Sequence, residues 1–129
     1  MKYLKPFFLV TDIGFILYWS ITALQIIPGE YLFNDYYNSI VMAWNWSFLP
    51  LDLLISLTGL SSLYMYKRKK EVWSRLALVS LVLTFCTGLM AIAFWAIKGD
   101  FDIAFWIMNL YAMIYPLFFV KRFIFGKPQ

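Results

Sequence analysis

The stretch IVMAWNWSFLPLDLLISLTGLSSLYMY, residues 40–66, followed at once by KRKK, residues 67–70, decides the fold class. It is longer than the roughly 20 apolar residues that a helix needs to cross a bilayer core. Its only charged residue is Asp52. Basic residues at one end are typical of the flank of a membrane span. The stretch therefore predicts a transmembrane helix.

Three further stretches have the same character, over residues 6–27, 76–97 and 103–120. The chain has 129 residues, of which 63% are hydrophobic and 14% charged. Soluble domains average roughly 45–50% apolar and 25% charged residues, and a chain this short cannot bury the excess in a water-soluble core. We therefore predict a single all-α domain over residues 1–129, a bundle of four transmembrane helices.

The basic residues predict the orientation of this bundle. With four spans, the N-terminus, the loop between the second and third spans and the C-terminus share one side, and that side holds ten of the eleven Lys and Arg residues. Only Lys98 falls on the other side. The positive-inside rule then predicts a multi-pass protein of the cell membrane with both termini in the cytoplasm. The asymmetry also argues against a dual-topology protein.

Several functional classes are excluded by composition. The chain has no histidine and one cysteine, Cys86. Histidine-based triads, haem with histidine ligation, most zinc sites and an intramolecular disulfide are therefore ruled out. We expect no cofactor and no metal, and no recognisable catalytic constellation argues for an enzyme. The positive charge is explained by membrane orientation, so no nucleic-acid partner is expected.

Two carboxyl groups lie inside the predicted spans. Asp52 is close to the bilayer midplane, and Asp12 is about 10 Å inside the cytoplasmic end of its helix at 1.5 Å per residue. A charged side chain in this position costs roughly 2.5–3.5 kcal/mol on insertion scales, so each is a functional hypothesis. Asn45, Asp52 and Ser56 fall on one helix face by their spacing of seven and four residues.

Aromatic residues accompany these polar faces, with six Trp, nine Tyr and thirteen Phe in the chain. A carboxyl group beside aromatic rings attracts a cationic amphiphile through charge and cation–π interactions. We predict an aromatic pocket within the bundle, with Asp52 as its polar anchor. The predicted ligand-binding residues are Asp52, Asn45, Trp46, Ser56, Asp12, Trp19, Trp106, Asn109 and Tyr115.

The alternative is that the small and hydroxyl residues, Thr87 among them, only pack the helices together. We expect Trp44 and Phe105 to face lipid.

Three short motifs carry a family resemblance. They are Ser47-Phe48-Leu49-Pro50-Leu51-Asp52, the exit Leu24-Gln25-Ile26-Ile27-Pro28, and Tyr111-Ala112 followed by Tyr115-Pro116. Together they resemble the EXPERA superfamily, which includes the sigma-2 receptor and the emopamil-binding sterol isomerase. The resemblance implies four membrane helices, cytoplasmic termini and a functional acid at Asp52.

The chain departs from that superfamily in two respects. The superfamily's acidic residue near the end of the first helix corresponds to Thr22, and Asp12 has no counterpart. The sterol isomerases use histidine, which this chain lacks, so the resemblance implies ligand binding without isomerisation. The whole chain also resembles an uncharacterised family of Bacillus membrane proteins, the YvaD type.

Three functions follow as hypotheses. The first is a module that binds a lipid, a sterol-like molecule or a cationic amphiphile at Asp52. The second is a small proton-coupled exporter with Asp12 as the exchanging carboxylate, since length, four spans and an acid in the first span resemble small multidrug-resistance transporters. The third is an accessory membrane subunit. The expected partner is a membrane lipid or hydrophobic small molecule, with a homodimer left open.

Overall fold

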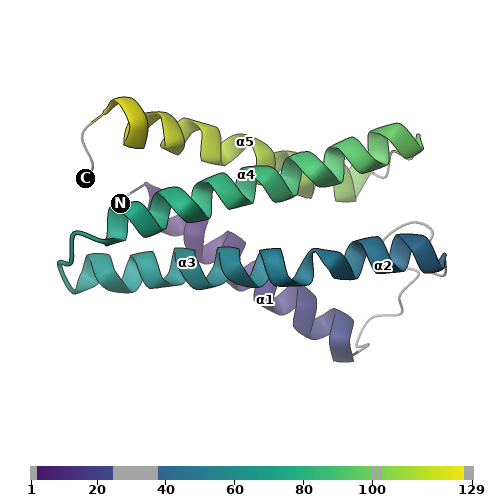
Figure 1. Ribbon diagram of the computed structural model, residues 1–129, viewed down its shortest axis with the longest axis horizontal. Coiled ribbons are helices and arrows are strands. Elements are labelled where there is room, and N and C mark those ends of the chain that lie inside the picture. The colour runs from purple at the N-terminus through teal and green to yellow at the C-terminus, as the bar shows by residue number, and fades with distance from the viewer. Residues whose placement is uncertain (1–2, 25–37, 100, 102, 127–129) are drawn as a thin grey trace.

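The computed structural model describes residues 3–24, 38–99, 101 and 103–126, and within these ranges it contains helices and no strand (Figure 1). The helices are α1 (Leu4–Leu24), α2 (Ser39–Ser47), α3 (Leu49–Lys67), α4 (Trp73–Lys98) and α5 (Ile103–Phe125). Four helical stretches are long and apolar enough to cross a membrane, with α2 and α3 together forming one of them. The prediction of an all-α chain with four membrane-length helices is confirmed.

The second span is divided into two helices that run end to end (Figure 1). The division falls at Phe48, whose backbone N–H donates to the Asn45 carbonyl at 3.1 Å in a tighter turn than an α-helix makes. Pro50 is the physical reason, because it has no N–H to continue the ladder and is best tolerated in the first turn of a helix. Regular bonding resumes where the Asp52 N–H donates to the Phe48 carbonyl at 2.8 Å.

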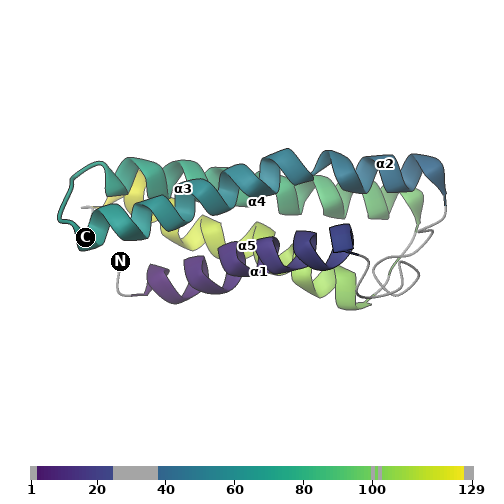
Figure 2. The same cartoon turned by 90° about the horizontal axis from the view of Figure 1, so that it is seen from below.

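Helix α3 is central to the packing, because it contacts both α1 and α4, and α4 in turn contacts α5. Figure 2 shows α1 on the same side of the α3–α4 pair as the first half of α5. Hydroxyl groups join the helices: Ser80 of α4 donates to the Ile55 carbonyl of α3 at 3.1 Å, and Ser62 of α3 to the Trp73 carbonyl at 2.8 Å. Such small polar residues let membrane helices approach closely.

The end of the bundle that carries Leu4 is filled by an apolar core. Its buried members are Leu4, Phe8, Trp73, Ala77, Leu81 and Tyr115. At the opposite end a second cluster forms around Val41 and Trp95. The space between these clusters is where the polar residues of the spans gather.

The observed helices differ from the predicted spans at their ends. Helix α4 begins at Trp73 instead of residue 76, and α5 continues to Phe125 instead of ending at residue 120. The apolar pattern defines only the membrane-spanning part, whereas a helix of good helix formers continues past it. Gly99 ends α4 in the left-handed conformation, with φ of 79°, as a glycine after a helix commonly does. The predicted end of the first span, residues 25–27, lies outside the described residues.

Candidate functional site

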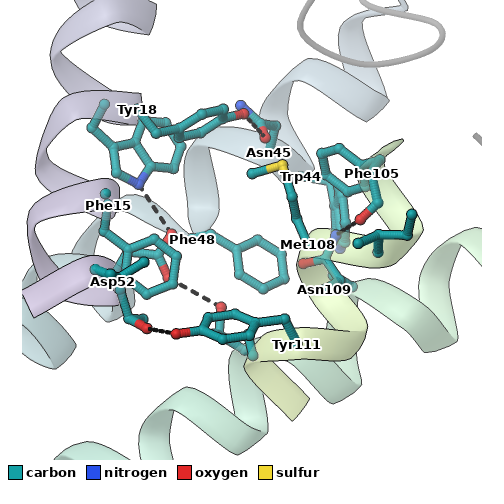
Figure 3. A pocket seen from close by; sticks show the side chains of 18 residues that line it. Phe15, Tyr18, Trp44, Asn45, Phe48, Asp52, Phe105, Met108, Asn109 and Tyr111 are labelled. Carbon is teal, nitrogen blue, oxygen red and sulfur yellow. Dashed lines mark hydrogen bonds between the residues drawn. The ribbon is translucent and has the colours of Figure 1, made fainter. Parts of the chain in front are cut away.

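A cavity of about 510 Å³ lies between the helices, in the part of the bundle nearer α2. All five helices contribute to its wall, and most of the wall is apolar (Figure 3). The lining residues are Val10, Thr11, Gly14, Phe15, Tyr18, Trp19, Trp44, Asn45, Phe48, Asp52, Thr87, Ala91, Phe105, Ile107, Met108, Asn109, Tyr111 and Ala112. A volume of this size is in the range of small-molecule sites, which run from roughly 300 to 1,000 Å³.

Asp52 is the only charged residue among those that line the cavity, and it is 5% exposed. Its two carboxyl oxygens are held from two other helices. The Trp19 indole N–H of α1 donates to Oδ2 at 3.0 Å, and the Thr87 hydroxyl of α4 donates to Oδ1 at 3.0 Å (Figure 3). The carboxyl group is therefore fixed in one orientation, and each oxygen keeps a lone pair for a further donor.

A second polar pair stands in the wall nearer α2. The Tyr18 hydroxyl donates to Asn45 Oδ1 at 3.0 Å (Figure 3). Asn45 is 5% exposed, and its Nδ2 has no hydrogen-bond partner among the residues that the structure describes. Asn109 differs, because its Nδ2 donates to the Phe105 carbonyl of its own helix at 2.8 Å. Asn45 thus offers a free donor, whereas Asn109 presents its amide oxygen.

Stacked rings make the apolar wall rigid. The Trp44 ring lies 3.9 Å from that of Phe94 in a stacked pair and 4.8 Å from that of Phe48 in an edge-on pair. Phe105 packs edge-on against Trp95 at 5.6 Å. Aromatic pairs of this geometry contribute about 0.5–1.5 kcal/mol beyond their buried area. The cavity is therefore bounded by side chains that are themselves held in place.

Helices α1 and α5 contact each other in the wall of the cavity. The hydroxyl groups of Thr11 and Tyr111 are hydrogen-bonded at 3.0 Å (Figure 3). Next to this contact, the Phe7 ring stacks on the rings of Tyr115 and Tyr111, with centroid distances of 5.0 Å and 6.2 Å.

Of the residues predicted from sequence, Asp52, Asn45, Trp19 and Asn109 come together in this wall. Trp46 lies outside the lining and packs against the lining residue Trp19, with the ring centroids 5.2 Å apart.

The remaining four predicted residues also lie outside the lining. The Ser56 hydroxyl donates to the Asp12 backbone carbonyl at 2.8 Å and so joins α3 to α1. Asp12 is fully buried, and Tyr115 belongs to the apolar core at the end that carries Leu4. Trp106 stands against Phe101, with their ring centres 5.2 Å apart.

Some lining residues were not expected from the sequence. Trp44 and Phe105, expected to face lipid, form part of the wall, and Thr87, whose alternative role was packing, holds Asp52. Periodicity gives the face of each helix but not which faces meet. For Thr87 a signal existed, since Ala91, which also lines the cavity, follows it at a spacing of four residues on the same face.

The fold and the site together define a helical bundle with four membrane-length stretches and a mostly apolar cavity between its helices. Residues 4–129 match the family described as "Family of unknown function (DUF5360)", and the chain belongs to this family. The chain is 52% identical over 120 residues to "Uncharacterized protein YvaD" of Bacillus subtilis (strain 168), which covers 93% of this chain and 90% of the relative. No solved structure matches the chain.

Proposed function

We propose that this protein binds a membrane amphiphile in the cavity, with Asp52 as the polar anchor. The observation that carries the proposal is the Asp52 carboxyl group, fixed at 3.0 Å by Trp19 and at 3.0 Å by Thr87 in an otherwise apolar wall. A packing role alone would not require a carboxyl group beside an open cavity. A buried carboxyl group is costly unless its oxygens are hydrogen-bonded, and here each oxygen has a donor.

The lining favours a particular class of head group. No Lys or Arg is among the lining residues, so an anionic head group would find no counter-charge. A primary ammonium, a quaternary ammonium or a hydroxyl group would be attracted to Asp52, and the rings of Trp44 and Phe48 add a face for a cation. The proposed ligand is a neutral or cationic amphiphile whose apolar part fills the aromatic end. The proposal also includes the resemblance to the EXPERA superfamily. On that resemblance, Asp52 takes the place of the superfamily's functional acid.

Native mass spectrometry tests the anchor. The protein is purified in a non-ionic detergent and analysed as purified and after titration with dodecyltrimethylammonium. We expect a stoichiometric adduct that Asp52→Asn weakens about 10- to 100-fold, because interactions with a charged group contribute about 1.5–3 kcal/mol. Glu71→Gln is the control, since it makes the same change at an exposed carboxyl group outside the lining and should leave the adduct unchanged.

The outcome that rejects the anchor is equal binding by Asp52→Asn and the parent protein. If no amphiphile binds to the folded parent protein, the cavity itself has no such ligand, and the accessory-subunit hypothesis is favoured. A homodimer stays a prediction from sequence.

We also propose that both termini face the cytoplasm, on the charge distribution given above. The lone cysteine is first removed by Cys86→Ala. Lys70→Cys and Lys98→Cys then place single thiols in exposed positions at opposite ends of the bundle. In intact cells a membrane-impermeant maleimide should label Lys98→Cys, and it should reach Lys70→Cys only after permeabilisation. The reverse pattern would place the termini outside.

A further inference from the structure

Asp12 has the most unusual surroundings of any side chain in the described part of the bundle. It is 0% exposed, and neither carboxyl oxygen has a hydrogen-bond partner. It points at α3, where a Cβ atom placed on Gly59 would overlap its Oδ2 atom and lie 3.0 Å from Ser80 Oγ. The glycine is therefore what leaves room for the carboxyl group.

The neighbouring hydroxyl groups do not serve this carboxyl group. Ser56 donates to the Asp12 backbone carbonyl at 2.8 Å, Ser80 to the Ile55 carbonyl at 3.1 Å and Thr84 to the Ser80 carbonyl at 2.7 Å. Each of these side chains has a single proton to donate, and each is used on the backbone. None of these three hydroxyl groups therefore donates to Asp12, and leaving a charged carboxylate buried without a donor is strongly unfavourable.

Tyr115 of α5 is the second buried group without a hydrogen-bond partner at this level. Its hydroxyl is buried, and its ring stacks on that of Tyr111 with the ring centroids 4.9 Å apart. The Tyr111 hydroxyl is in turn hydrogen-bonded to Thr11. Among the helices packed around Asp12, α3 presents Ser56 and Gly59, α4 presents Ser80 and Thr84, and α5 presents Tyr115. Of these, only Tyr115 can ionise, and none carries a positive charge.

We propose that Asp12 is a proton-binding site, connected to the cavity through the hydroxyl groups of Tyr115, Thr11 and Tyr111. Thr11 and Tyr111 line the cavity and share a hydrogen bond of 3.0 Å in which either oxygen can donate. Each hydroxyl passes its own proton to the next acceptor and accepts one from the group before it. When Asp12 ionises, its proton ends on a water molecule in the cavity, which becomes hydronium. Each hydroxyl in between breaks one O–H bond and forms another, so the three hydroxyl groups keep their charge.

The proton site at Asp12 does not depend on what fills the cavity. The exchange of its proton for a bound cationic ligand rests on the proposed function. Gly59, which Asp12 touches, is seven residues from Asp52, or about 10 Å along α3. A cation bound at Asp52 would be attracted to an ionised Asp12 across this distance. In a medium of intermediate dielectric constant, this attraction raises the affinity for the cation by a factor of roughly ten. Ligand and proton therefore oppose each other, which is the exchange that a proton-coupled transporter requires.

Infrared difference spectroscopy of the protein in phosphatidylcholine nanodiscs tests the site without any ligand. We expect a carbonyl stretch of a protonated carboxylic acid at neutral pH that shifts in D₂O. It should disappear in Asp12→Asn, persist in Asp52→Asn and move to a new frequency in Asp12→Glu, a variant that guards against loss of folding. Absence of the band from the parent protein, or its loss in Asp52→Asn alone, would overturn the proposal. Its disappearance on adding NaCl at constant pH would identify an alkali-cation site instead.

The relay is tested by the rate at which this band shifts in D₂O. Tyr115→Phe keeps the ring and its stacking but removes one proton carrier from the relay, and it should slow the shift roughly tenfold, or about 1.4 kcal/mol in the barrier. Tyr18→Phe is the matched control, because Tyr18 lines the cavity and bonds Asn45 outside the relay. Equal rates in the parent protein and Tyr115→Phe would reject the relay.

Coupling is measured by adding dodecyltrimethylammonium, whose charge does not depend on pH. The Asp12 band should decrease on saturation in the parent protein and stay constant in Asp52→Asn. Binding of the probe with an unchanged Asp12 band would reject the exchange while leaving the proposed ligand function intact. Failure of the probe to bind, with the band present, would reject the ligand function while leaving the proton site intact.

Discussion

Gly88→Ala is expected to destabilise the protein more than a methyl addition at either of the other glycines within the described helices, Gly14 and Gly59. A Cβ atom at Gly88 would lie 2.6 Å from the Met113 backbone nitrogen and 2.7 Å from the Asn109 carbonyl oxygen. Both atoms belong to the backbone of α5 and cannot rotate away, so α4 and α5 must separate. Overpacking of this kind costs about 1–3 kcal/mol and occasionally more, and we expect the upper end of that range.

The measurement is the free energy of unfolding in mixed micelles as sodium dodecyl sulfate is added, followed by circular dichroism. Gly14→Ala is the control, because an added Cβ atom there meets no atom within 4 Å. Alanine is favoured over glycine in a helix by about 1 kcal/mol, so this control should be neutral or slightly stabilising. Similar stability of Gly88→Ala and Gly14→Ala would show that α4 and α5 are farther apart than described.

Since Asn109 also lines the cavity, separation of α4 and α5 should affect the site as well as stability. A ligand adduct seen with the parent protein should be weakened in Gly88→Ala even under conditions where the variant remains folded. The close helix approach and the cavity are in this sense two properties of one interface.

The all-α class and the four membrane-length stretches could be predicted from the sequence because the signals are local. An apolar run of about 20 residues with charged ends specifies a membrane-length helix whatever its neighbours are. The division at Phe48 was not predicted, although Pro50 is a local signal for it, since it removes a donor that the helix needs. The site could be predicted only in part, because a helix face is a local property and a cavity is not.

Particular residues show what the sequence pattern of one helix can and cannot predict about the cavity. Asn45 and Asp52 lie on one predicted face, and both line the cavity. Ser56 continues that face, yet its hydroxyl is used to join α3 to α1 at Asp12. Trp44 is of a residue type that is common at membrane interfaces, but its ring stacks on that of Phe94 inside the bundle, with the centroids 3.9 Å apart. Only the arrangement of the helices decides between these outcomes.

The two buried carboxyl groups have opposite surroundings in the structure. Asp52 has a donor for each oxygen and stands beside open space, whereas Asp12 has no donor and stands against Gly59. The sequence marked both as exceptional but could not distinguish them, since hydrogen-bond satisfaction depends on side chains from other helices. This difference is why we assign ligand binding to one and proton binding to the other.

The second large effect is expected at the contact between Gly59 and Asp12, and it should appear as a coupling between two substitutions. Gly59→Ala alone places a Cβ atom in the space of the Asp12 carboxyl group, with Cγ only 2.8 Å away. Asp12 is fully enclosed and cannot move to solvent, so we expect a loss of about 1–3 kcal/mol in the free energy of unfolding. In an Asp12→Ala background the overlap is gone, and Gly59→Ala should then be close to neutral, because the next nearest atom, Ser80 Oγ at 3.0 Å, belongs to a side chain that can turn.

The double-mutant cycle isolates this contact from the separate effects of each change. A coupling energy of about 1–3 kcal/mol in favour of the double variant is expected for residues in direct contact. Asp12→Asn supplies the matched background, because it removes the ability to ionise but keeps the size, and it should give no relief to Gly59→Ala. Relief by Asp12→Asn equal to that by Asp12→Ala would mean that charge and not volume governs the contact. Zero coupling in both backgrounds would mean that Asp12 does not lie against Gly59, and the proton site would then lose the enclosure on which it depends.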